Sequence, residues 1–290
     1  MSRSASSRAN RRGEPPPSPE PLPGPAVDSH THFDIAVGGE DRQPTDAEVD
    51  EAIAAAVTVG VPRLVQVGVD VDSSRWSAEL AARRPEVLAA VALHPNEAGV
   101  GAATGPALAE IDRLAALPRV RAVGETGLDR YRTGEDGWAV QEASFRAHID
   151  IAKRHGIALV IHDRDAHDEV LRVLEAEGAP EHTVLHCFSG DAGFARRCID
   201  RGYVLSFAGT LTFGNAGHLR EAAAMTPLDQ LLVETDAPFL TPAPLRGRPN
   251  SARLVPHTVR ALSDVTGTPL HQLCAALTAN AERVFGSWEE

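Results

Sequence analysis

Residues 158–187 read ALVIHDRDAHDEVLRVLEAEGAPEHTVLHC, and this stretch carries the pattern that decides the fold. Its two apolar runs, Ala158–His162 and Thr183–Cys187, have the length and composition of buried strands. Between them, Ala166–Glu177 has a helical pattern, and Gly178 marks its end. A strand, a helix and a strand in this order predict a parallel βαβ unit, because parallel strands need a crossover connection.

The same alternation runs through the chain from Val27 onward. Six further apolar runs predict strands at Val27–Phe33, Leu64–Val69, Val87–Leu93, Val120–Gly124, Tyr203–Phe207 and Leu231–Glu234. Helical patterns separate many of them, for example Thr45–Val59, Ser73–Arg84, Gly105–Leu117, Val140–His155 and Asp191–Arg201. Eight such units in about 260 residues predict an α/β fold of the (β/α)8 TIM barrel type. An open doubly wound sheet would need a Gly-rich phosphate turn after an early strand, and none is seen.

Local signals mark the ends of several predicted helices. Thr45 followed by Glu48 predicts a capped helix start, and Ser73 or Ser74 ahead of the next helical pattern predicts another. Gly156 follows a helical pattern directly and is therefore expected to end that helix.

The composition predicts a tail followed by one domain. Residues 1–25 are rich in Ser, Arg and Pro, so they bury too little apolar surface to offset their ordering entropy. We expect this segment to be disordered, with a weak basic contact arm as the alternative, and it lacks the apolar core of a secretion signal. Residues 26–290 are expected to form the barrel as a single domain.

Charge and cysteine content narrow the functional classes. The formal net charge of −12 argues against a protein that coats nucleic acid through a broad basic surface. The cysteines Cys187, Cys198 and Cys274 show no paired spacing, which indicates a reduced, cytoplasmic setting. The sequence contains no apolar run of about 18 residues, so no membrane span is predicted. No obligate protein partner is evident.

The segment DSHTH at residues 28–32 ends the first predicted strand. Side chains alternate along a strand, so His30 and His32 should point the same way and could bind one ion together. Asp28 should face the same interior, as should Glu234 on the last strand. Both carboxylates would hold ligand histidines in the correct tautomer, or would form a buried salt bridge beneath the site.

Ionisable residues end four more of the predicted strands. Charged groups at the end of an apolar run are costly unless they are paired or bind a metal. The set of candidate metal ligands is His30, His32, Glu125, His162, His186 and Asp236. Strand ends of a (β/α)8 barrel meet at one face, so convergence of these groups predicts a metal centre.

The ligand set suits two divalent ions that share a carboxylate. Glu125 would bridge the ions, with a hydroxide between them that serves as the nucleophile. One ion would take His30, His32 and Asp236, and the other His162 and His186. Asp236 also suits the role of general base, which makes Asp236 and Glu125 the candidate catalytic residues.

These motifs together resemble the TatD family of metal-dependent hydrolases, in the amidohydrolase-like group of barrels. The matching segments follow the family's order: DSHTH (28–32), VALHP (91–95), VGETGLD (123–129), IHDR (161–164), LHCFSG (185–190) and LVETDAPFL (232–240). The resemblance implies a divalent-metal hydrolase of phosphodiester bonds, deoxyribonuclease-like, that commonly acts as a 3′–5′ exonuclease on single-stranded DNA or RNA.

The resemblance also implies roles for single residues. It assigns metal binding to the six ligands named above, and it makes His94 and Arg164 substrate contacts. Lys153, the only lysine, lies within a helical pattern, so the bridging ligand is expected to be Glu125 and not a carbamylated lysine. Two departures bear on the substrate: Asn96 stands where many members have a second histidine, and Arg248-Pro-Asn250 differs from the family's usual Arg-Asn-Glu-Pro.

Two other functions fit part of the pattern. A metal-dependent amide or ester hydrolase, such as a deacylase, would use the same ligands, because a metal can polarise a carbonyl as well as a phosphoryl group. A degenerate barrel that only binds a partner would have no need of a complete ligand set. The expected cofactors are two divalent ions: four imidazoles favour Zn²⁺, Mn²⁺ or Fe²⁺, whereas the resemblance implies Mg²⁺.

Overall fold

The computed structural model describes residues 14–39 and 42–289. The chain divides into two compact units, and each is described by itself. The first unit comprises Met1–Val65, Asp191–Arg196 and Ser206–Ala281, and the second comprises Gln66–Gly190, Arg197–Leu205 and Glu282–Glu290. Among the described residues, no helix has the length and apolar character needed to cross a membrane.

The first unit contains the first and last strands of the sheet, β1 (Val27–Thr31) and β8 (Leu231–Val233). Just beyond β8, Ala237 pairs in parallel with Thr31, and the N–H of His32 donates to the Ala237 carbonyl over 2.9 Å. The helices and short turns of this unit are α2 (Phe33–Ala36), α3 (Asp46–Val57), η2 (Gly209–Thr212), α10 (Gly217–Met225), η3 (Leu228–Gln230), η4 (Ala252–Leu254), α11 (Val255–Thr266) and most of α12 (Leu270–Phe285).

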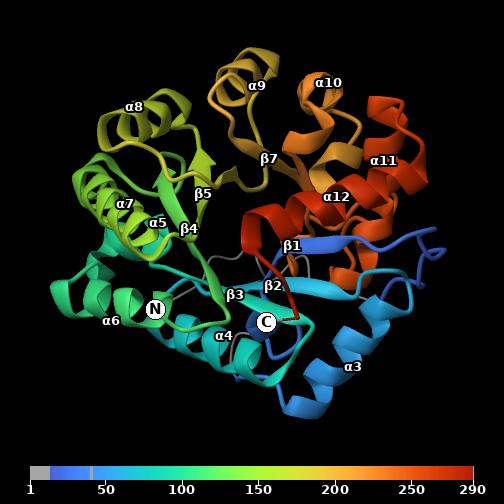
Figure 1. The fold of residues 1–290 in the computed structure, drawn as a ribbon, viewed down its shortest axis with the longest axis horizontal. Coiled ribbons are helices and arrows are strands. Elements are labelled where there is room, and N and C mark those ends of the chain that lie inside the picture. The colour runs from blue at the N-terminus through green and yellow to red at the C-terminus, as the bar shows by residue number, and fades with distance from the viewer. Residues whose placement is uncertain (1–13, 40–41, 290) are drawn as a thin grey trace. The chain divides into compact units, whose positions relative to one another are not determined.

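The second unit holds the middle of the sheet. Its strands are β3 (Val87–Val91), β4 (Val120–Asp129), β5 (Ala158–Arg164) and β6 (Thr183–Leu185). Its helices are α4 (Val71–Arg83), α5 (Pro95–Glu97), η1 (Ala98–Ala102), α6 (Gly105–Ala115), α7 (Glu135–His155) and α8 (His167–Glu177). The strands β3, β4, β5 and β6 pair in parallel, and Figure 1 shows α7 and α8 lying outside β4 and β5. All five residues of β3 are buried, as expected for a sheet covered on both faces.

The strands follow one another in the sheet in chain order, from β1 to β8. Two of them, β2 (Arg63–Val67) and β7 (Val204–Phe207), begin in one unit and end in the other, and α9 (Ala192–Ile199) also spans a unit boundary. Eight strands in sequential order that alternate with helices define the (β/α)8 barrel fold. The predicted fold class is therefore confirmed.

Most predicted element boundaries hold within a few residues, and the larger differences have local causes. β4 runs five residues past its predicted end at Gly124, because its pairing with β5 continues as far as Asp129. α7 begins at Glu135, five residues before the predicted start, with Gly134 as its N-cap and two acidic residues in its first turn. Gly156 ends that helix in the left-handed conformation with φ 63°, as predicted.

Helix starts follow side-chain caps. Thr45 and Glu48 form the predicted capping box at the start of α3. For α4 the cap is Asp70, whose carboxylate accepts from the N–H of Ser73, so the helix begins at Val71 and Ser73 lies inside its first turn. The predicted cap at Ser73 or Ser74 therefore lay three or four residues beyond the actual cap, Asp70.

Part of the proline-rich segment contacts the first unit. Residues 1–13 lie outside the described residues, but residues 14–25 of the predicted tail make hydrogen bonds within the first unit. Arg260 donates to the carbonyls of Glu20 and Pro21, and the N–H of Leu22 donates to the carbonyl of Val59 over 3.1 Å. Proline residues leave carbonyl acceptors with few N–H donors nearby. Arginines of α11 and its neighbouring turn supply those donors, and the boundary between tail and barrel at residue 25 stays a prediction.

Candidate metal centre

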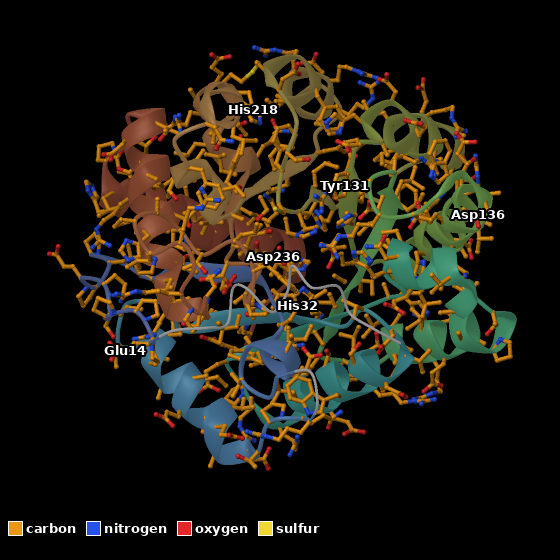
Figure 2. The ribbon with its side chains drawn as sticks, turned by 180° about the vertical axis from the view of Figure 1, so that it is seen from behind. Glu14, His32, Tyr131, Asp136, His218 and Asp236 are labelled. Atoms are coloured by element: carbon orange, nitrogen blue, oxygen red, sulfur yellow. The ribbon has the colours of Figure 1, made fainter. Side chains whose placement is uncertain are left out.

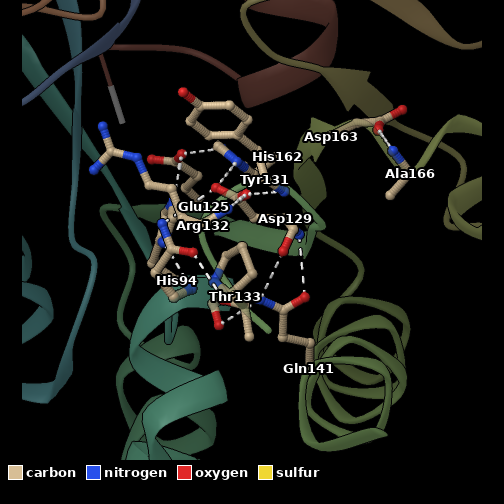
Figure 3. A network of polar contacts seen from close by, with 12 residues as sticks. His94, Glu125, Asp129, Tyr131, Arg132, Thr133, Gln141, His162, Asp163 and Ala166 are labelled. Carbon is tan, nitrogen blue, oxygen red and sulfur yellow. Dashed lines mark hydrogen bonds and ion pairs between the residues drawn. The ribbon is translucent and has the colours of Figure 1, made fainter. Parts of the chain in front are cut away.

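Three histidine rings surround one carboxylate oxygen in the second unit. The Oε1 atom of Glu125 lies 2.8 Å from Nδ1 of His162, 3.0 Å from Nε2 of His186 and 3.1 Å from Nε2 of His94. We call these four residues the Glu125 cluster; Figure 3 shows three of them, Glu125, His94 and His162. Ligand atoms of those three lie within 4.8 Å of one another. The structure thus brings two predicted metal-ligating histidines of this unit to Glu125, and it places His94 with them.

Four consecutive strands, β3 to β6, and the residues that follow them supply the cluster. His94 follows β3 and caps α5, Glu125 lies in β4, His162 lies near the end of β5, and His186 follows β6 directly. The pairing of β4 with β5 is irregular between Val123 and Thr126, at the position of Glu125. Irregular pairing of this kind is typical of positions where a strand re-aims a functional side chain.

A close approach of backbones makes glycine necessary beside Glu125. A Cβ atom on Gly124 would lie 2.5 Å from the Cβ of Val160 and 2.7 Å from its carbonyl oxygen. Such contacts would push β4 away from β5 and separate Glu125 from His162. In the VGE part of the motif, Gly124 is therefore required for close packing of β4 against β5, and Glu125 supplies the carboxylate.

The charge of Glu125 is stabilised by its neighbours. Burial acts to raise the pKa of Glu125, but the charges of His186 and His94 and the hydrogen bonds from His162 and His186 hold that pKa well below its usual range. Burial lowers the pKa of His94, although Glu125 opposes the shift. An anionic carboxylate beside an imidazole that favours its neutral form is a donor set suited to a divalent cation.

Asp129, the last residue of the VGETGLD motif, also belongs to this site. Its Oδ2 atom lies 3.3 Å from Nε2 of His162 and accepts from Nδ2 of Asn96 over 3.2 Å. Burial raises the pKa of Asp129, but its hydrogen bonds with His162 and the backbone of Arg132 give a net lowering. Asp129 lies four residues after Glu125 on a strand, so the even spacing was a signal that both face the same way.

The His162 ring is thus held at both nitrogens. Burial lowers its pKa, but hydrogen bonds with Asp129 and Glu125 outweigh burial and raise it. A carboxylate on the second nitrogen of a ligand histidine fixes the orientation of the ring. Asn96, the departure from the usual second histidine, takes part in this arrangement because it donates to Asp129 and accepts from the Thr133 hydroxyl over 3.1 Å.

The first unit contains a second group of potential ligands. Nε2 of His30 lies 3.2 Å from Nε2 of His32, and Oδ1 of Asp236 lies 3.5 Å from His32 Nε2 and 3.9 Å from His30 Nε2. We call these three residues the His30 cluster; His32 and Asp236 are labelled in Figure 2. His30 in β1 and His32, the residue that follows β1, both approach Asp236.

Backbone contacts between β1 and the segment after β8 position Asp236. Its N–H donates to the carbonyl of His30 over 2.9 Å, and it adopts a left-handed conformation with φ 52°. Non-glycine residues in this conformation are uncommon and gather at functional sites. Asn250, from the region that departs from the family motif, is buried and donates to the carbonyls of Thr235 and Phe239. It therefore supports both flanks of Asp236.

Asp28 and Glu234 lie beneath the His30 cluster and are fully buried. The carboxylate of Asp28 accepts from the Thr235 hydroxyl over 2.6 Å, from the Thr235 N–H over 2.8 Å and from the His30 N–H over 3.4 Å. Burial is the main cause that raises the pKa of Asp28 to about 7, and the charge of Glu234 adds to it. These contacts of Asp28 reach the main chain of His30, and a role for Asp28 in setting the ring tautomer stays a prediction.

Arginines carry positive charge near two of the strand ends. The Arg164 guanidinium carbon lies 4.0 Å from the centroid of the Tyr131 ring in the second unit. In the first unit, the Arg246 guanidinium carbon lies 4.1 Å from the centroid of the Phe213 ring. Lys153 lies on α7 and donates to the carbonyl of Glu177 over 2.7 Å, which confirms that the only lysine is not at a strand end.

Comparisons with known proteins agree with the motifs. The family model described as TatD related DNase matches residues 27–286. An uncharacterized metal-dependent hydrolase TatD of Mycobacterium tuberculosis is 48% identical over 264 residues, which cover 90% of this chain and 97% of that protein. A protein of Citrobacter rodentium named 3′-5′ ssDNA/RNA exonuclease TatD is 35% identical over 262 residues, which cover 88% of this chain and 97% of that protein.

A solved structure supports the same relationship. The crystal structure of YjjV, a TatD homolog from Escherichia coli, superposes with a TM-score of 0.83 at 26% sequence identity. The match covers 90% of this chain and 98% of that chain. The likeness therefore spans the whole barrel and is not confined to the motifs.

Proposed function

Because this chain belongs to the TatD-related DNase family, whose relatives are metal-dependent hydrolases, we propose that it is a 3′–5′ exonuclease on single-stranded DNA or RNA. Membership of the family confirms the predicted resemblance and the prediction of a metal-dependent hydrolase that acts on ester bonds. The choice of nucleic acid as substrate is the finer step. It is supported by relatives from Citrobacter rodentium and Klebsiella pneumoniae that are named as 3′-5′ ssDNA/RNA exonucleases.

The observation that carries the proposal is the arrangement around Glu125. Three imidazole nitrogens lie within 3.1 Å of one oxygen of this buried carboxylate. Four such groups would not converge in a buried place for stability alone, because their burial is costly without a shared partner. Nitrogen and carboxylate donors in this number fit a divalent cation.

Each cluster would hold one ion. His162, His186 and Glu125 would hold one, with His94 close enough to join them, and His30, His32 and Asp236 would hold the other. When bound, such ions lower the pKa of a water and stabilise negative charge on a phosphoryl oxygen. Nitrogen-rich donor sets favour Zn²⁺ or Mn²⁺ over Mg²⁺. A bridging role for Glu125 stays a prediction.

The protein's own groups would move the proton and hold the substrate. Asp236 would accept the proton of the attacking water, because it is a partly exposed carboxylate beside two histidines. Arg164 would hold a phosphate that is not cleaved, since a planar guanidinium can donate to two oxygens at once. His94 would lie close enough to Glu125 to contact either the metal or the scissile phosphate.

Substrate class decides between this proposal and a deacylase. We would incubate the protein and Mn²⁺ with a 5′-labelled single-stranded oligonucleotide, with the same strand blocked at its 3′ end, and with p-nitrophenyl acetate. The proposal predicts a ladder that shortens from the 3′ end, loss of that ladder on the blocked strand, and no ester hydrolysis above background. Ester hydrolysis without release of nucleotides would overturn it. A Glu125→Gln preparation purified in the same way controls for contaminating nucleases.

A further inference from the structure

We propose that Tyr131, with the Arg164 guanidinium against its ring, is a stacking platform for one nucleobase of a single-stranded substrate. This inference rests on the proposed function and deepens it, because it assigns a base-binding position to the second unit. Tyr131 was not among the residues that sequence reasoning selected.

The exposure of Tyr131 is the first observation. Its residue surface is 66% exposed although an arginine lies 4.0 Å from the ring centroid. The guanidinium lies over one face of the ring, so a flat partner would approach the other face. A tyrosine placed in this way contributes little to the core, which leaves the open face available to a flat partner.

The turn that carries the Tyr131 ring is held by a side chain that also contacts the Glu125 cluster. Oδ1 of Asp129 accepts from the N–H of Tyr131 over 3.0 Å and from the N–H of Arg132 over 2.7 Å. Oδ2 of the same carboxylate contacts Nε2 of His162. One side chain therefore fixes both the turn that carries the aromatic ring and a candidate metal ligand. Figure 3 labels Tyr131 in the same polar network as Asp129, His162 and Glu125.

The register of two strands places the arginine next to the ring. Asp129 on β4 pairs with Arg164 on β5, and the N–H of Arg130 donates to the Arg164 carbonyl over 2.9 Å. Tyr131 lies two residues beyond Asp129, and Arg164 lies two residues beyond His162. Arg164 is the last residue of β5, and Tyr131 lies two residues after the end of β4. These are the strands that carry His162 and Glu125.

A nucleotide matches both groups. A base can stack on the open face of the tyrosine, and the guanidinium on the other face strengthens the arrangement and offers donors to the adjoining phosphate. Stacking of this kind accepts any base, because every base has a π face. An amino-acid ester or a simple acyl substrate would use only part of this surface.

The test measures binding without turnover, on the full-length protein in EDTA. A single strand with 2-aminopurine at one of its last three 3′ positions reports stacking through fluorescence quenching, and a matched strand has an abasic residue at the same position. We would compare wild type with Tyr131→Phe, which keeps the ring, and Tyr131→Leu, which removes it. Arg164→Ala and Arg75→Ala form a second pair; Arg75 is an exposed arginine of α4 that pairs with Glu110.

If Tyr131 stacks on one base, its substitution should affect binding through one position of the strand only. At that position Tyr131→Leu should weaken binding of the intact strand by about 5-fold to 150-fold and abolish the quenching, and Tyr131→Phe should restore both. On the abasic strand wild type and Tyr131→Leu should bind alike. Arg164→Ala should weaken binding of both strands, and Arg75→Ala should weaken neither.

Three outcomes would overturn the inference. Equal losses for Tyr131→Leu on intact and abasic strands would mean that the ring only positions Arg164. No loss on either strand, in a protein that degrades oligonucleotides, would remove Tyr131 from substrate binding while the proposed function survives. Failure of wild type to bind or cleave any strand would remove both proposals together.

Discussion

Nε2 of His162 lies 3.3 Å from Oδ2 of Asp129, so the histidine that contacts Glu125 through one ring nitrogen is held by a second carboxylate through the other. Outer partners of this kind set the tautomer and orientation of a ligand histidine. The relationship explains why Asp129 is fully buried at the end of a strand although it carries a charge.

Asp129→Asn should weaken metal binding without unfolding the protein. The amide removes the negative charge beside His162 but keeps an oxygen that can accept from the backbone N–H groups of Tyr131 and Arg132. Metal affinity should fall about 10-fold to 100-fold. Calorimetric titration with Mn²⁺ measures this loss, with Asp72→Asn on the exposed face of α4 as the matched control. An affinity equal to that of wild type would show that Asp129 has no part in metal binding.

Asp236→Asn tests the assignment of the general base. The amide keeps an oxygen near His30 and His32 but cannot accept the proton, and loss of a general base typically costs about 100-fold to 10,000-fold in rate. The value of kcat should therefore fall much further than KM changes, with metal still bound at raised concentration. Steady-state kinetics on a single-stranded oligonucleotide measures the split. Near-normal turnover with metal bound would place the base elsewhere.

Asp28 should make the stability of the metal-free protein depend on pH. Burial raises its pKa from 3.8 to about 7 in the folded state, so between these values the folded protein holds a proton that the unfolded chain has released. Its contribution to stability is complete below about pH 3.8 and is lost as the pH rises towards 7, a change on the order of a few kcal/mol. Urea unfolding in EDTA should show a smaller decline over this range for Asp28→Asn than for wild type. Parallel declines in the two proteins would contradict the assignment.

Removal of residues 14–25 should destabilise the first unit. The deletion removes the carbonyls that accept from Arg253, Arg260 and Thr278, and each such hydrogen bond contributes about 0.5–1.5 kcal/mol. A variant that lacks residues 1–13 should have the melting temperature of the full chain, and one that lacks residues 1–25 should melt several degrees lower. Differential scanning fluorimetry distinguishes the two. Equal melting temperatures would contradict this expectation and support the predicted tail boundary at residue 25.

Local patterns in the sequence were enough to predict the fold and to select most of the candidate ligands. Alternation along β1 indicated that His30 and His32 face the same way, and the run of apolar residues before Glu125 indicated a buried strand. Both signals depend on neighbours within a few residues. The same holds for Thr45 and Gly156, whose capping roles depend on a single helical turn.

Contacts between segments that are far apart in the sequence could not be predicted from local patterns. The pairing of Asp129 with Arg164 depends on the register of β4 against β5, and only that register brings Tyr131 under the guanidinium. His94 reaches Glu125 through the turn after β3, which the motif alone does not place. The proline-rich segment is held by donors more than 200 residues away, so its composition alone suggested disorder.

The most direct test of the proposed metal centre measures metal-dependent cleavage by Glu125→Gln. We would measure cleavage of a 5′-labelled single-stranded oligonucleotide across a Mn²⁺ titration for wild type, for Glu125→Gln and for Glu79→Gln, an exposed glutamate of α4. Glu125 lies at the centre of three histidines, so its loss should cost more than the roughly 100-fold effect of an outer partner. We expect that Glu79→Gln cleaves like wild type and that Glu125→Gln shows almost no cleavage at any Mn²⁺ concentration. Cleavage by Glu125→Gln at the wild-type rate with the wild-type metal dependence would contradict it.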